Sequence, residues 1–98
     1  MDGRTIVVMP AYNAGKTLEK THAGVIAQDC VDNVIVVDDG SSDDTARTAE
    51  EAGALVIVHE QNQGKAQAIN TGLQRAREMD AASVILLCMY AGLFVALW

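Results

Sequence analysis

The sequence predicts an α/β domain of three layers, in which a mainly parallel sheet lies between two layers of helices. Four short apolar runs rich in β-branched residues alternate with three segments of helical character. Each apolar run is continuous rather than alternating with polar residues, so both faces of each strand should be covered. Strand and helix repeated three times and closed by a fourth strand is typical of a doubly wound α/β fold.

The predicted strands are residues 5–9, 34–37, 55–58 and 83–87, and the predicted helices are about residues 14–27, 43–52 and 65–79. In the first helix, apolar positions recur at intervals of three and four residues, which places them on one face toward the core. This face makes His22 a packed histidine rather than a catalytic base. The positions are Leu18, His22, Val25 and Ile26.

The second and third helices carry signals for their ends and their packing. Serine and aspartate at positions 41–44 can accept hydrogen bonds from the N–H groups that begin the second helix, and Gly53 fits its C-terminal stop. In the third helix, Gly72 lowers helix propensity but permits close approach of the backbone. The expected buried face of this helix consists of Ala66, Ile69, Leu73 and Ala76.

Composition and charge exclude several kinds of partner and site. The chain has 98 residues, a formal net charge of −6 at pH 7 and 50% hydrophobic residues. The acidic excess argues against binding to nucleic acid, because phosphates need a basic surface. Cys30 and Cys88 lie far apart with no metal-ligand spacing around them, so neither a disulfide framework nor a zinc site is indicated. The start of the chain lacks the profile of a secretory signal, and we expect a cytoplasmic protein.

The apolar C-terminal region has two interpretations. Residues 81–98 contain Ser83 as the only clearly polar side chain, and 18 such residues reach the lower limit for a membrane-spanning helix. The fourth strand uses the same residues, however, and they cannot serve both purposes. There are therefore two alternatives to an α/β enzyme. One is a fragment anchored to a membrane by its tail, and the other is a non-enzymatic fragment that forms a homo-oligomer through this apolar region.

The end of the second predicted strand carries the strongest chemical signal. Ligands of open parallel sheets bind beyond the carboxyl ends of the strands, where Asp38 and Asp39 precede Gly-Ser-Ser. One interpretation is a capped turn. The other is that Asp39 faces a cleft and accepts a hydrogen bond from a nucleobase N–H, with Tyr12 across the cleft as a flat stacking surface.

Phosphate-binding signals are weaker. Neither a Walker A pattern nor Gly-x-Gly-x-x-Gly is present, so ATP-dependent and dinucleotide functions lose their main support. Asn62, Gly64 and Lys65 stand at the start of the third helix, where N–H groups and a cation could meet phosphate. A solvated helix end is the alternative, and for Lys65 alone it is favoured. His59 ends a strand without a serine or cysteine nucleophile near it in sequence.

Three blocks in this order resemble the N-terminal half of a family 2 glycosyltransferase: IVVMPAYN (6–13), VIVVDDGSSDDT (34–45) and NQGKAQAINTG (62–72). The resemblance covers residue 4 to about residue 87. It implies the Rossmann-like GT-A fold with sheet order 3-2-1-4, and a module that binds a nucleotide-diphospho-sugar, expected to be UDP-linked. The residues that it assigns to the nucleotide are Pro10, Ala11, Tyr12, Asp38, Asp39, Asn62, Gly64 and Lys65, with Asp39 reading a uracil-like edge and Asp38 supporting the turn.

The fourth strand departs from the family pattern. Family members carry an Asp-x-Asp motif there that binds Mg or Mn and the sugar diphosphate, whereas this sequence has Cys88-Met89-Tyr90. Thiol, thioether and phenol are poor ligands for these hard cations. We therefore expect residues 1–88 to be the nucleotide-sugar-binding half of a truncated GT-A domain and residues 89–98 an apolar tail, with no metal site and no catalytic residue. The full-length enzyme would transfer sugar to an acceptor, and this chain alone would be inactive. A different nucleotide-binding enzyme, such as a nucleotidyltransferase, is a further alternative.

Overall fold

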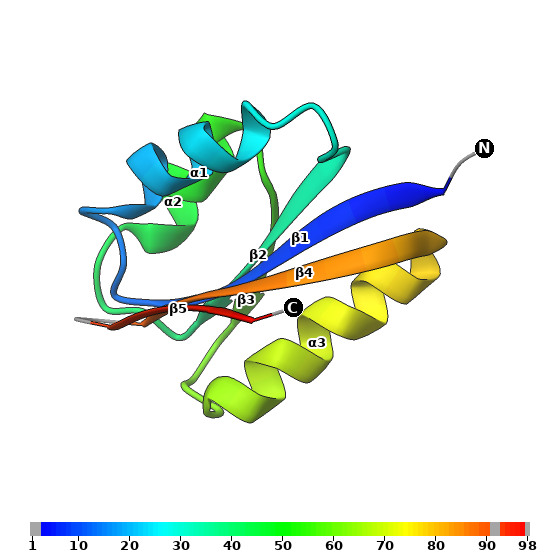
Figure 1. Ribbon diagram of the computed structural model, residues 1–98. Coiled ribbons are helices and arrows are strands. Elements are labelled where there is room, and N and C mark those ends of the chain that lie inside the picture. Colours follow the sequence, from blue (N-terminus) through cyan, green and yellow to red (C-terminus); the bar gives the residue numbers. More distant parts are fainter. Residues whose placement is uncertain (1–2, 91–92, 98) are drawn as a thin grey trace.

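A twisted five-stranded sheet runs through the middle of the molecule (Figure 1). The computed structural model describes residues 3–90 and the backbone of residues 93–97. Strands follow the spatial order β3-β2-β1-β4-β5, which confirms the predicted order 3-2-1-4 for the first four. In chain order the elements are β1 (Arg4–Tyr12), α1 (Leu18–Ile26), β2 (Asn33–Asp39), α2 (Thr45–Ala52), β3 (Leu55–His59), α3 (Lys65–Glu78), β4 (Ala81–Tyr90) and β5 (Leu93–Leu97).

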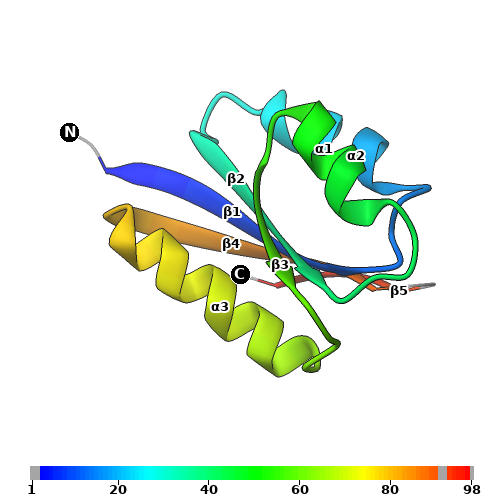
Figure 2. The ribbon, with the colours of Figure 1, turned by 180° about the vertical axis from the view of Figure 1, so that it is seen from behind.

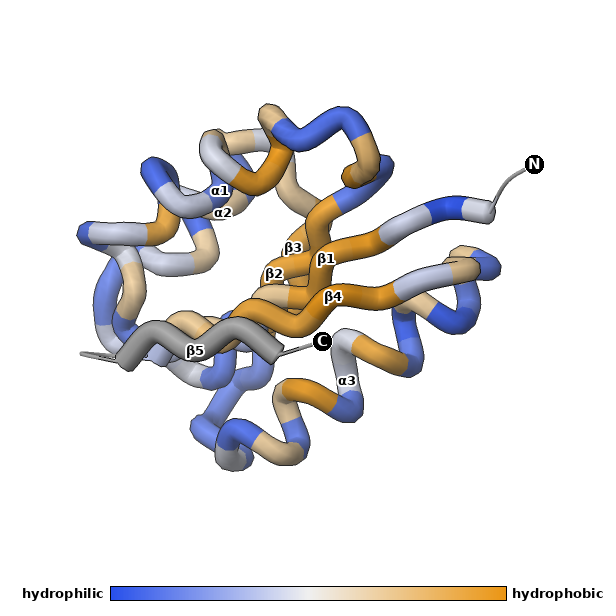
Figure 3. The backbone as a smooth tube through the Cα atoms, in the orientation of Figure 1, coloured by the Kyte–Doolittle hydropathy of each residue, from blue (hydrophilic) through white to orange (hydrophobic). Residues whose placement is uncertain are grey.

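Helices cover both faces of the sheet, as a fold with continuously apolar strands requires. Helices α1 and α2 lie together on one face and α3 lies on the other, which is clear from both sides of the molecule (Figures 1 and 2). In Figure 3 the hydrophobic segments, coloured orange, lie mainly in the strands at the centre of the molecule. Alternate residues of each strand supply two cores: Val7, Met9, Val34 and Val36 pack with Leu18 and Ala49, whereas Ile6, Val8, Ile35 and Val37 pack with Ala68 and Ala76.

Helix α3 lies very close to the sheet because its contact face is made of small residues. Ala68, Gly72 and Ala76 are its buried positions. A Cβ atom at Gly72 would overlap Cγ1 of Val8, which confirms the predicted close approach. Of the predicted buried face, Ala76 is buried as expected. Ala66 is exposed, however, and Ile69 and Leu73 are only half-buried.

The ends of α1 and α2 follow the local signals only in part. Helix α1 begins at Leu18 rather than at residue 14, because residues 14–17 form a tight turn in which the Ala14 carbonyl accepts hydrogen bonds from Thr17 and Leu18. Leu18 and His22 are buried as predicted, whereas Ile26 at the end of the helix is 46% exposed. Helix α2 ends at Gly53 in the left-handed conformation, with φ of 99°, as predicted.

The C-terminal region is strand rather than helix. Residues 81–90 form β4, which is parallel to β1, and residues 93–97 form β5, which is antiparallel to β4. The fifth strand was not predicted, and positions 91, 92 and 98 of the expected tail lie outside the described residues. Within residues 3–90 and 93–97, no helix has the length and hydropathy that crossing a membrane requires.

Candidate functional site

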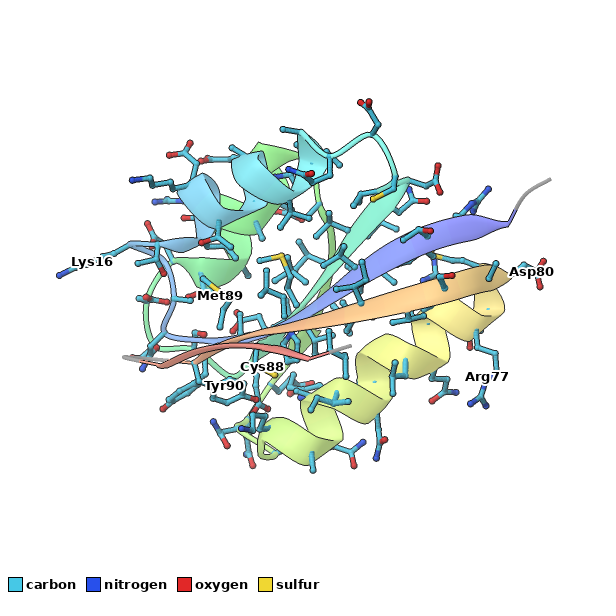
Figure 4. All side chains as sticks on the ribbon, viewed as in Figure 1. Lys16, Arg77, Asp80, Cys88, Met89 and Tyr90 are labelled. Atoms are coloured by element: carbon cyan, nitrogen blue, oxygen red, sulfur yellow. The ribbon has the colours of Figure 1, made fainter. Side chains whose placement is uncertain are left out.

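The carboxyl ends of four strands bring the predicted site residues to one edge of the sheet. Tyr12 of β1 is level with Tyr90 of β4, and Asp39 of β2 is level with His59 of β3. Side chains alternate between the faces of a strand, so Tyr12, Asp39 and Tyr90 share the face that α3 covers. Asp38 shares the opposite face with Met89, and Figure 4 shows Met89 across β4 from Cys88 and Tyr90.

Asp39 is the centre of this edge. Its side chain is fully buried, yet both carboxylate oxygens have partners. Oδ1 accepts a hydrogen bond of 2.8 Å from the Gln63 N–H, and Oδ2 accepts bonds from the Gly64 N–H at 3.1 Å and the Tyr90 hydroxyl at 2.9 Å. Burial acts to raise the pKa of Asp39, but the hydrogen bonds from Gln63, His59 and Tyr90 outweigh burial and hold it below the ordinary value. The carboxylate is therefore ionised at neutral pH.

His59 extends the contacts of Asp39 into α3. Its Nδ1 lies 3.0 Å from Asp39 Oδ1, and because an ionised carboxylate can only accept, this nitrogen carries a proton. Its Nε2 lies 3.0 Å from the hydroxyl of Thr71, which is also 3.0 Å from the Gln67 carbonyl. Sequence patterns did not indicate this chain of contacts. The signal that could have found it is that Asp39 and His59 end neighbouring parallel strands.

Tyr90 joins the two residues that were predicted to hold a base. Its hydroxyl donates to Asp39, and its ring centroid lies 5.9 Å from that of Tyr12, with the two planes tilted by 34°. Burial, and then the hydrogen bond to Asp39 and its charge, raise the pKa of the Tyr90 hydroxyl far above its ordinary value. Tyr90 is therefore neutral and can act as a hydrogen-bond donor.

The turn after β2 is tied to the turn after β1 by side chains from the other face. Asp38 accepts a hydrogen bond of 3.0 Å from the N–H of Ser41, whose hydroxyl oxygen accepts one of 2.8 Å from the N–H of Asn13. In return, the side-chain oxygen of Asn13 accepts a bond of 2.8 Å from the N–H of Ser42. Asp38 therefore shapes the turn, and its side chain is almost fully buried.

The other predicted residues differ in what they present. Pro10 and Ala11 are fully buried in β1 and present no exposed surface at this edge. Asn62 accepts a hydrogen bond of 3.0 Å from the Gly64 N–H, which Asp39 also uses. Lys65 is the exposed first residue of α3. Burial raises the pKa of the Cys88 thiol, and the positive charge of Lys65 opposes this rise without cancelling it.

The end of β4 does not fit a divalent metal. Cys88 is a buried thiol, Met89 is buried as well, and the hydroxyl of Tyr90 already bonds to Asp39. In the part of the chain that the structure describes, no three side chains of the His, Cys, Asp or Glu type converge. Mg and Mn prefer a shell of oxygen ligands that usually includes carboxylates, so these residues would not hold either ion.

Comparison with known proteins places the chain in a family. Residues 6–88 match the family described as Glycosyl transferase family 2. The chain belongs to glycosyl transferase family 2. Among curated members, UDP-N-acetylglucosamine–dolichyl-phosphate N-acetylglucosaminyltransferase of Methanococcus voltae is 33% identical over 92 residues, which covers 76% of this chain and 36% of that protein. Glucosyl-3-phosphoglycerate synthase of Mycobacterium tuberculosis is 44% identical over 62 residues, covering 60% of this chain and 19% of that protein.

Solved glycosyl transferase structures share the fold. The M. tuberculosis glucosyl-3-phosphoglycerate synthase in complex with Mn²⁺, UDP and glucosyl-3-phosphoglycerate superposes with a TM-score of 0.68 at 29% identity, covering 90% of this chain and 33% of that one. A mannosyltransferase of Pyrobaculum calidifontis in complex with GDP-Man and Mn²⁺ gives 0.73 at 27% identity, covering 93% and 28%. The chain thus spans about a third or less of the length of these solved relatives.

Proposed function

We propose that this chain is the nucleotide-sugar-binding half of a glycosyltransferase and that it binds the uridine end of a UDP-linked sugar. The observation that carries this proposal is that the ionised, buried carboxylate of Asp39 and the ring of Tyr12 both lie next to Tyr90 at the carboxyl edge of the sheet. A uracil ring presents one N–H to an acceptor and a flat face for stacking. The UDP complex of the similar M. tuberculosis enzyme supports the choice of nucleotide.

In this proposal each element supplies a different part of the site. Pro10 and Ala11 line the base pocket, Tyr12 stacks on the base, and Asp39 accepts its N–H. Asp38 holds the turn that presents Asp39. Asn62 and Gly64 shape the loop before α3, and the Lys65 ammonium group offers a cation to the diphosphate.

Sugar transfer belongs to the longer enzymes of the family. A glycosyltransferase needs a group that stabilises the departing diphosphate and a base that takes the proton of the acceptor hydroxyl. The residues at the end of β4 would not hold a metal ion, and none of them is a carboxylate that could act as the base. We therefore expect residues 1–88 to supply recognition of the donor, and this chain by itself to show no transfer.

Isothermal titration calorimetry of the chain with UDP tests the proposal. Asp39→Ala should abolish binding, because it removes the only acceptor proposed for the base N–H. Asp43→Ala is the matched control: Asp43 also accepts hydrogen bonds from backbone N–H groups, those of Thr45 and Gly15, but lies outside the proposed site, so this variant should keep its affinity. Unchanged affinity in Asp39→Ala, or tighter binding of a purine nucleotide than of UDP, would count against the assignment.

A further inference from the structure

The side chain of Tyr90 lies across the end of β1. Its strand, β4, is separated from β2 by β1 in the sheet, and yet its hydroxyl reaches Asp39 on β2 at 2.9 Å. The ring therefore passes over the carboxyl end of β1, next to Tyr12. This is the space that a base would need in order to contact Tyr12 and Asp39 at once.

Tyr90 also meets the chemical requirements of that space. A phenol is a flat six-membered ring with one hydrogen-bond donor, and a uracil presents the same combination through its ring N–H. The centroid distance of 5.9 Å to Tyr12 lies within the range of favourable aromatic pairs. Neutral Tyr90 supplies the donor that occupies Oδ2 of Asp39, which also accepts the Gly64 N–H.

We propose that Tyr90 occupies the base position in the free chain, and that a uridine nucleotide binds only after this side chain has turned away. The base N–H then replaces the Tyr90 hydroxyl on Asp39, so the carboxylate keeps the same number of donors. This inference rests on the function proposed above and adds an internal competitor to the same site. The one-ring size of the side chain favours a pyrimidine over a purine as its replacement.

The consequence is a measurable loss of affinity in the wild-type chain. When the competent state is only a fraction of the molecules, the apparent dissociation constant rises by the inverse of that fraction. Tyr90→Phe removes the hydroxyl that holds the side chain on Asp39 and keeps the ring. A hydrogen bond to a charged group contributes about 1.4 kcal/mol or more, so this variant should bind UDP about ten-fold more tightly.

Two further variants make the test specific. Tyr90→Ala removes the ring as well, and should gain at least as much affinity as Tyr90→Phe. Thr71→Val is the matched control, because it breaks the contact between Thr71 and His59 and leaves the contact between Tyr90 and Asp39. Its affinity for UDP should equal that of the wild type. Far-UV circular dichroism establishes that each variant is folded.

The outcomes separate this inference from the proposed function. Tighter binding by Tyr90→Phe and Tyr90→Ala but not by Thr71→Val supports both. If the wild type binds UDP and neither Tyr90 variant gains affinity, Tyr90 is no competitor, although the nucleotide site stands. An equal gain in Thr71→Val overturns the inference too, because general loosening then explains the effect. If no chain binds UDP, the proposed function itself is wrong and the inference falls with it.

Discussion

Asp39 shows how one buried side chain can organise several backbone segments. Its oxygens accept from Gln63, Gly64 and Tyr90, and His59 lies against it. The loop between β3 and α3 is therefore held against the end of β2 by a charge rather than by apolar contact. A buried charge is tolerated when such hydrogen bonds replace its water.

Gly40, the residue after Asp39, makes this arrangement sterically possible. It has a φ of 72°, and a Cβ atom there would lie 2.5 Å from the backbone nitrogen of Asn62. Gly40→Ala should therefore reduce the free energy of unfolding by about 3 kcal/mol, through backbone strain and a clash with main-chain atoms. Urea unfolding monitored by circular dichroism gives the value.

Gly53 is the matched control for Gly40. It also has a positive φ, of 99°, but nothing lies within 4 Å of a Cβ atom built there. Gly53→Ala should cost only the left-handed conformation, about 1 kcal/mol. Equal losses in the two variants would show that the approach of the loop to Gly40 is unimportant.

At the scale of elements, close packing of α3 depends on residues that sequence periodicity ranks low. Ala68, Gly72 and Ala76 form the contact, whereas the larger Ile69 and Leu73 lie beside it. A pattern of apolar positions favours large side chains at the centre of a helix face. It misses a face whose small residues allow the backbone itself to approach the sheet.

Gly72→Ala should destabilise the protein even though alanine is the better helix former. The added methyl group would overlap Val8 and lie 3.2 Å from Cγ2 of Val37. Overpacking of this kind outweighs the gain in helix propensity, and we expect a net loss of about 2 kcal/mol in the free energy of unfolding. Chemical denaturation of both proteins at the same pH measures the difference.

Gly24 in α1 provides the opposite case. It is exposed, and nothing lies within 4 Å of a Cβ atom built on it. Gly24→Ala should therefore gain about 0.5–1 kcal/mol. A gain in Gly72→Ala similar to that in Gly24→Ala would mean that α3 lies farther from the sheet than described.

For the whole molecule, Asp39 links stability to pH. Its pKa is lower in the folded state than the ordinary value of 3.8, so the folded state binds its proton less tightly than the unfolded chain does. The stabilisation is fully present above pH 3.8 and is lost as the pH falls toward the folded pKa. The free energy of unfolding should decrease over that range in the wild type.

Asp39→Asn should reduce this pH dependence. The variant is less stable at pH 7, because an amide nitrogen meets N–H donors, but it has no carboxyl group to titrate at this position. Its free energy of unfolding should fall less steeply below pH 3.8. Asp43, whose pKa is also lowered, leaves a residual slope. A slope as steep as that of the wild type would contradict the role given to Asp39.

Most of the fold could be predicted because each strand between residues 4 and 90 contains a continuous apolar run, and such runs favour a sheet with helices on both faces. The rest depends on contacts distant in the chain. Tyr90 and Asp39 are 51 residues apart, and nothing near either residue signals their hydrogen bond. Strand β5 was missed because it follows β4 directly and pairs with it antiparallel, whereas the prediction relied on strands and helices that alternate. The roles of the eight predicted nucleotide-binding residues remain predictions, although Tyr12 and Asp39 both lie next to Tyr90.

The contacts of Asp39 come from β3, β4 and the loop before α3, so no local segment contains the candidate site. Local unfolding of any one of these elements would remove part of the contacts of Asp39 and so disrupt the site. A small molecule that binds only the native arrangement must therefore oppose every such opening at once. If UDP binds as proposed, its binding is thermodynamically linked to global folding, because the groups that contact Asp39 come from distant parts of the chain.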